Sequence, residues 1–121
     1  MDGFMREALA EARQGFEEGG VPIGAVLVKE GRIIGRGRNR RVQEGASVIH
    51  AEIDCLRNAG KVTDYRGSVL YSTLMPCLIC AGAVAQMGIA KVVASESETL
   101  SGERWLMESY GVEIVDLDLL E

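Results

Sequence analysis

The sequence lacks the features that mark membrane proteins, secreted precursors and disulfide-stabilised scaffolds. It contains no run of 18 or more apolar residues, so we expect no transmembrane helix. Residues 1–12 mix acidic, basic and apolar side chains, unlike a secretory signal, and a cytoplasmic location is therefore expected. The chain has only three cysteines, an odd number, which argues against a disulfide framework. Cys55, which stands apart from the other two, is expected to be a small buried core residue.

Linkers, internal repeats and low-complexity segments are also lacking, so the chain is expected to form a single domain, residues 1–121. Positive charge is in deficit: 13 Lys and Arg against 18 Asp and Glu give a net charge of −5, which argues against a nucleic-acid partner. One basic cluster nevertheless stands out. For this cluster we favour a solvated surface over an oligomer interface or a site for an anionic partner. It consists of Arg32, Arg36, Arg38, Arg40 and Arg41.

Hydrophobic periodicity and turn residues predict alternating helices and strands. The first helix is expected to run from a cap at Asp2 to about Glu18. Two strands, 23–29 and 32–38, are expected to form an antiparallel hairpin, followed by a polar loop over 39–45. The later elements are a helix over 47–60 capped by Ser47, a strand over 69–72, a helix over 76–87 with Pro76 in its first turn, a strand over 90–94, a helix over 102–110 and a strand over 112–115. This order favours an α/β fold in which a mixed five-stranded sheet lies between helical layers.

Two short motifs carry the chemistry. His50-Ala51-Glu52 precedes Pro76-Cys77-Leu78-Ile79-Cys80, and together they match the H-x-E…P-C-x-x-C pattern of zinc deaminases. One imidazole and two thiolates make three zinc ligands and leave a fourth position open for water. We expect both motifs at helix N-termini, whose field favours the thiolate form of the two cysteines.

Glu52 is expected to move protons rather than to bind the metal. Bound zinc lowers the pKa of water to about 7. A carboxylate two residues beyond the ligand His50 can then shuttle protons for attack of that water on an aminated ring carbon. A structural zinc site would normally have four protein ligands, and only Cys55 is available as a fourth. A redox role for the C-x-x-C would leave the His-Ala-Glu motif without a purpose.

The chain resembles the cytidine deaminase superfamily, and within it the fungal-type cytosine deaminases. The resemblance covers nearly the whole chain. It is carried by the two motifs and by segments 15–24, 35–39 and 70–77. It implies a three-layer α/β/α cytidine-deaminase-like fold, and an activity that converts cytosine, a free nucleobase, to uracil with release of ammonia.

The resemblance also implies the site residues. Zinc, one ion per subunit, would be held by His50, Cys77 and Cys80, with Glu52 as general acid and base. The Asn39 amide and the backbone N–H of Ala51 would read the substrate carbonyl, and the pocket walls would be apolar (Ile23 and Leu74). Members of this kind are homodimers.

Some residues depart from the cytosine deaminase pattern. Met75 stands where a serine is usual, and Ala51 stands where a glycine is usual. The C-terminal helix that closes the family pocket is expected to be missing after the last strand, and neither Asp116 nor Asp118 aligns with its aspartate. Several alternatives therefore stay open: a deaminase of guanine, creatinine or a pterin, a tRNA adenosine deaminase, which also has His-Ala-Glu, or a non-catalytic zinc-bearing scaffold.

Overall fold

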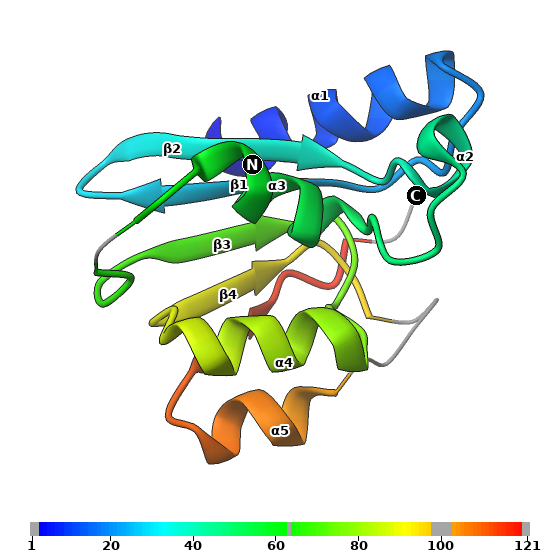
Figure 1. The fold of residues 1–121 in the computed structure, drawn as a ribbon. Coiled ribbons are helices and arrows are strands. Elements are labelled where there is room, and N and C mark those ends of the chain that lie inside the picture. Colours follow the sequence, from blue (N-terminus) through cyan, green and yellow to red (C-terminus); the bar gives the residue numbers. More distant parts are fainter. Residues whose placement is uncertain (1–2, 63, 98–102, 120–121) are drawn as a thin grey trace.

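A computed structural model describes residues 3–62, 64–97 and 103–119. The elements are α1 (Gly3–Glu17), β1 (Gly24–Lys29), β2 (Arg32–Arg38), α2 (Arg41–Glu44), α3 (Ala51–Ala59), β3 (Val69–Ser72), α4 (Leu78–Met87), β4 (Lys91–Ala94), α5 (Arg104–Ser109) and β5 (Glu113–Asp116). The five strands form one sheet with helices on both of its faces (Figure 1).

The strand order across the sheet is β2-β1-β3-β4-β5. β1 pairs antiparallel with β2 and with β3, whereas β3, β4 and β5 run parallel to one another. The tight turn between β1 and β2 places both Glu30 and Gly31 at positive φ, 53° and 75°, as a two-residue hairpin turn requires. The mixed five-stranded sheet expected from the sequence is confirmed.

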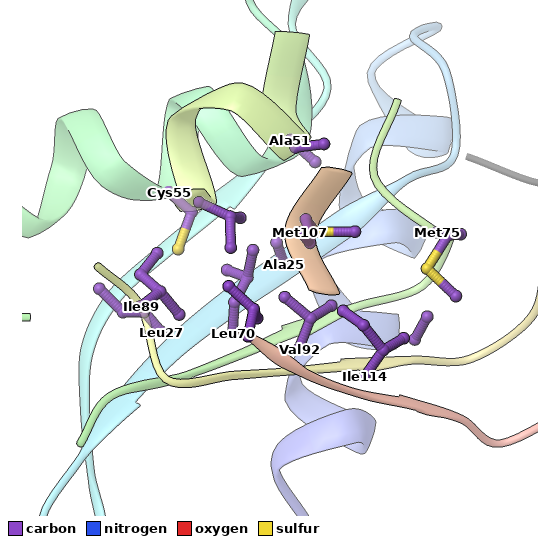
Figure 2. Close-up of a cluster of buried hydrophobic side chains, with 14 residues drawn as sticks. Ala25, Leu27, Ala51, Cys55, Leu70, Met75, Ile89, Val92, Met107 and Ile114 are labelled. Atoms are coloured by element: carbon purple, nitrogen blue, oxygen red, sulfur yellow. The ribbon is translucent and has the colours of Figure 1, made fainter. Parts of the chain in front are cut away.

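Alternation along the strands separates two apolar layers. Leu27, Leu70, Val92 and Ile114 come from four different strands and lie in one buried cluster with residues of α3, α4 and α5 (Figure 2). The opposite face packs against α1 through Met5 and Ala8. The three-layer α/β/α arrangement is therefore confirmed. Cys55 is fully buried in the larger cluster, as expected.

Several element boundaries differ from those expected. Helix α3 begins at Ala51 with His50 as its N-cap, so Ser47 does not cap it. Residues 46–50 instead form tight turns, in which the N–H of His50 bonds the carbonyl of Val48 at 2.9 Å. α4 begins at Leu78 with Cys77 as its N-cap, which leaves Pro76 just outside the helix.

Smaller differences occur elsewhere. The expected polar loop over 39–45 contains the short helix α2. Among the described residues the helix expected over 102–110 spans Arg104–Ser109, while its expected start at Gly102 and the cap expected at Asp2 lie outside the described residues.

Arg32, Arg36 and Arg41 of the basic cluster are exposed, as expected of a solvated surface, but Arg36 and Arg38 also form ion pairs. Arg36 forms ion pairs with Glu7 and Glu11 of α1, at 2.8 and 2.6 Å. Arg38 pairs with Glu11 and Glu18 at 2.7 and 3.0 Å. These alternating side chains of β2 thus connect the strand to helix α1 and to Glu18, the residue that follows it. Among the described residues, no helix is long and apolar enough to cross a membrane.

Candidate active site

The N-termini of α3 and α4 meet at one end of the sheet. His50 is the N-cap residue of α3 and Cys77 is that of α4, and both have extended backbone conformations. His50 Nδ1 lies 3.4 Å from Cys77 Sγ. Together with Cys80, one turn into α4, these residues offer three ligand atoms that all lie within 4.8 Å of one another. The convergence of the two motifs expected from the sequence is therefore present in the fold.

The geometry of this group fits a zinc ion. Zinc bonds of about 2.3 Å to sulfur and 2.0 Å to nitrogen, at tetrahedral angles, place sulfur and nitrogen ligands about 3.5 Å apart. The distance from His50 Nδ1 to Cys77 Sγ agrees with that spacing. Burial and the nearby Arg41 charge lower the pKa of His50, which keeps the imidazole neutral, as a metal ligand must be.

Cys80 differs from the sequence-based expectation of a thiolate favoured by the helix N-terminus. Burial, followed by the negative charge of Glu52, raises the pKa of the Cys80 thiol. A bound metal ion would supply the positive charge that favours the Cys80 thiolate, which is the usual source of thiolate character in such sites.

Glu52 lies beside the three ligand atoms but is buried, with only 5% of its surface exposed. Its Oε2 atom lies 3.4 Å from the hydroxyl oxygen of Ser72, at the end of β3. Burial raises the pKa of Glu52, while hydrogen bonds from Cys80 and Ser72 act in the opposite direction. A carboxyl group that holds its proton more tightly than usual is suited to alternate between acid and base near neutral pH.

A cleft of about 150 Å³ opens in front of these groups. It is lined by Val21, Ile23, Asn39, Arg41, His50, Glu52, Leu74, Met75 and Cys77. The sequence-predicted residues Asn39, Ile23 and Leu74 thus lie together with the two motifs. Ala51 is fully buried as the first residue of α3, where its backbone N–H belongs to the first helical turn.

Asn39 is held firmly at the wall of the cleft. It is 3% exposed, and its backbone N–H donates to the carbonyl of Ile23 at 3.0 Å. Its side-chain Oδ1 accepts a hydrogen bond from the backbone N–H of Arg41 at 3.1 Å. That bond fixes the orientation of the amide and leaves its two N–H donors for a ligand.

Sequence reasoning missed four residues of the site. Val21, Arg41 and Met75 line the cleft, and Ser72 contacts Glu52. Met75 immediately precedes the Pro-Cys motif and Arg41 belongs to the basic cluster. Both residues were noted in the sequence, but neither was assigned to the active site. Nothing in the local sequence distinguishes Ser72 from any other strand residue. Trp105, the one tryptophan of the chain, is 65% exposed on α5 and does not line the cleft.

Comparison with known proteins agrees with this geometry. The family model for the cytidine and deoxycytidylate deaminase zinc-binding region matches residues 1–96. A cytosine deaminase from Candida albicans is 34% identical over 94% of this chain and 78% of its own length. A tRNA-specific adenosine deaminase from Bacillus subtilis is 46% identical over 74% of this chain, which spans 58% of that protein. The structure of a guanine deaminase from Bacillus subtilis superimposes with a TM-score of 0.72 and 28% identity, covering 93% of this chain and 72% of that one.

These relatives share one chemistry, the hydrolytic removal of an amino group, on different bases. The match of the family model spans both motifs and the whole cleft. The chain therefore belongs to the cytidine and deoxycytidylate deaminase family and is a zinc-binding hydrolytic deaminase.

Proposed function

We propose that this protein deaminates cytosine, as the free base, to uracil and ammonia. The observation that carries the proposal is the content of one small cleft, which brings the Asn39 amide, the Glu52 carboxyl group and the ligands His50 and Cys77 together. Its volume of about 150 Å³ is well below the roughly 300 Å³ at which pockets for drug-sized ligands begin, and so favours a single small ring.

His50, Cys77 and Cys80 would hold one zinc ion per chain, which would act as a Lewis acid and lower the pKa of a water molecule to about 7. Glu52 accepts a proton from the attacking water and delivers it to the ring nitrogen beside the aminated carbon. The carboxylate then takes the remaining proton of the added hydroxyl group and delivers it to the amino group, which leaves as ammonia as the carbon–nitrogen bond breaks. One water is consumed, and a carbon–oxygen bond replaces the carbon–nitrogen bond.

The remaining residues of the cleft orient the ring. The free N–H donors of Asn39 and the backbone N–H of Ala51 bind the carbonyl oxygen of the base. Ile23 and Leu74 cover its flat faces with apolar surface and keep bulk water from the reacting carbon. Cysteine ligands remain reduced in the cytoplasm, the compartment in which we place the reaction.

Adenosine in tRNA is the second candidate substrate. It is supported by the 46% identity to the tRNA-specific adenosine deaminase and by Ala51, which that class shares between its His and Glu. An extruded base could enter the same cleft while the rest of the RNA stays outside. The net charge of −5 argues against it, because a nucleic-acid partner requires local positive charge.

Ammonia release from matched substrates tests the proposal. Zinc-loaded protein is assayed with cytosine, cytidine, guanine and a tRNA anticodon stem-loop containing adenosine, and Glu52→Ala serves as the inactive control. We expect the highest kcat/KM for cytosine. Faster turnover of the stem-loop or of guanine would identify that molecule as the substrate in place of cytosine. Turnover of none of the four compounds would favour a non-catalytic zinc-bearing scaffold.

We also propose that two copies associate through helix α4. Its sequence is almost entirely apolar, and Leu78, Ile79 and Met87 are 59%, 48% and 45% exposed. A helix that is apolar all round is normally buried on all sides. Light scattering should therefore show a dimer, and Ile79→Lys should shift it toward monomer. A monomeric wild-type protein at micromolar concentration would contradict this proposal.

A further inference from the structure

Asp54 is a buried charge that the proposed chemistry does not use. Its side chain is 0% exposed, and it lies on α3 one turn after the ligand His50, whose carbonyl accepts the Asp54 backbone N–H at 2.8 Å. Such a carboxylate is costly to bury unless several donors satisfy it. The hydrogen-bond donors that contact Asp54 therefore indicate the role of this buried carboxylate.

Two of these donors come from the residues on either side of Asn39. Asp54 Oδ2 accepts the backbone N–H of Arg38 at 3.0 Å and the side-chain Nε–H of Arg40 at 2.9 Å. Its other oxygen accepts an N–H of Arg57 at 2.5 Å. One carboxylate oxygen thus binds both neighbours of the residue that faces the substrate ring.

Backbone hydrogen bonds complete this attachment. The N–H of Asn39 bonds the carbonyl of Ile23, which also lines the cleft, and the N–H of Arg40 bonds the carbonyl of Ile49 at 2.9 Å. Ile49 immediately precedes the ligand His50. The backbone around Asn39 is therefore fixed both to the cleft wall and to the segment that carries the metal ligand.

Close approach of strand β2 to helix α3 makes these bonds geometrically available. A Cβ atom on Gly37 would lie 2.7 Å from the carbonyl carbon of Asp54 and from Cys55 Cα, closer than real Cβ atoms come. Without a side chain at Gly37, the strand backbone lies directly against the helix. The short Asp54 side chain can then reach the N–H of Arg38.

We propose that Asp54 is a positioning residue for recognition of the ring: it holds Asn39 at a fixed place relative to Glu52 and the ligand His50. The inference rests on the role of Asn39 in the proposed function. Its consequence is that loss of Asp54 weakens binding of the base, because the amide moves, and leaves the zinc ligands and the Glu52 proton transfer in place.

A double-mutant cycle between Asp54 and Asn39 tests this inference. KM and kcat for cytosine, the Kd of pyrimidin-2-one by calorimetry and the zinc content are measured for Asp54→Ala, Asn39→Ala and the double variant. We expect Asp54→Ala to raise KM and Kd about tenfold, the worth of one hydrogen bond, with kcat changed about twofold or less and zinc retained. In the Asn39→Ala background the same change should have almost no effect on either constant.

Asp64→Ala is the matched control. Asp64 also accepts a backbone N–H and an arginine side chain, both from Arg66, at 2.9 and 3.1 Å, but it lies outside the cleft. It should leave KM unchanged. If Asp54→Ala does not fold, Arg40→Met removes one donor from Oδ2 and is expected to raise KM in the same Asn39-dependent way.

The outcomes separate the inference from the proposed function. Equal effects of Asp54→Ala in both backgrounds would overturn the positioning role, since Asp54 would then act on the fold alone. An unchanged KM in Asn39→Ala would remove Asn39 from the site, and this inference would fail with it. A wild-type protein that neither deaminates cytosine nor binds pyrimidin-2-one would contradict the proposed function itself.

Discussion

Replacing Gly37 by alanine should disturb both the stability and the substrate binding of this deaminase. The added Cβ would lie 2.7 Å from the carbonyl carbon of Asp54 and from Cys55 Cα, and closer still to the backbone nitrogen of Cys55, all in α3. Carbon atoms in contact normally lie about 3.5–4.0 Å apart, so the overlap is about 1 Å. Backbone atoms of a helix cannot rotate away as a side chain does, and β2 and α3 must therefore separate.

The cost follows from that separation. Overpacking of a well-packed interior costs about 1–3 kcal/mol. Separation by about 1 Å would also lengthen the 3.0 Å bond from Arg38 N–H to Asp54 to about 4 Å, beyond hydrogen-bond distance, at a further cost of about 1 kcal/mol. The free energy of unfolding should fall by about 2–4 kcal/mol, which corresponds to a melting temperature about 8–15 °C lower for a domain of this size.

Urea unfolding followed by circular dichroism, together with KM for cytosine, measures these effects. Gly3→Ala is the control, because a Cβ at Gly3 would have nothing within 4 Å, and its unfolding free energy should stay within about 0.5 kcal/mol of the wild type. KM should rise in Gly37→Ala, since Asn39 directly follows the displaced strand. A Gly37→Ala protein as stable as Gly3→Ala, with unchanged KM, would refute the argument that close approach of β2 to α3 sets the cleft.

Three further predictions concern the charged and metal-binding groups. Glu52→Ala should lower kcat by about 10²–10⁴-fold, which is the usual contribution of a positioned acid or base, and the variant protein should still bind zinc. Loss of zinc in elemental analysis would show that Glu52 is a ligand instead. Chelation of the metal should abolish ammonia release and lower the melting temperature. The loss of unfolding free energy should be about 4 kcal/mol if zinc was present at a thousandfold its Kd, and added zinc should restore both activity and stability. Activity that survives complete removal of the metal would exclude the proposed site. Burial by itself would raise the pKa of Asp54, but hydrogen bonds from Arg38, Arg40 and Arg57 outweigh it and lower that pKa below its ordinary value of 3.8. The stability that ionised Asp54 contributes is therefore present above pH 3.8 and is lost as the pH falls through the lowered pKa. The difference in urea stability between wild type and Asp54→Asn should be full at pH 6 and shrink below pH 4, and a difference independent of pH would contradict this sign.

Local sequence determined much of the chemistry of this protein. His50 and Glu52 lie two residues apart and Cys77 and Cys80 three apart, and such short spacings fix relative side-chain positions at a helix start whatever surrounds it. The alternation of apolar residues likewise specified the strands and their buried faces, so the mixed sheet between helical layers could be expected from the sequence.

Cap positions depended on longer-range contacts. Ser47 is a good N-cap by type, yet α3 begins four residues later, at Ala51. The carbonyl of Ile49 accepts the N–H of Arg40 at 2.9 Å, and residues 46–50 form tight turns instead of a helical turn. The hydrogen bond between Arg40 and Ile49 therefore outweighs the preference of Ser47 for an N-cap position.

Only the tertiary structure decided which residues meet. The 3.4 Å approach of His50 Nδ1 to Cys77 Sγ joins groups 27 residues apart in the chain. Periodicity places each group on an element but does not measure the distance between two elements. The same holds for Asp54, whose sequence position beside Glu52 gives no sign that it binds Arg38 and Arg40. Those contacts depend on how closely β2 packs against α3, and that distance is set by side-chain volume across the whole interface rather than by any one segment.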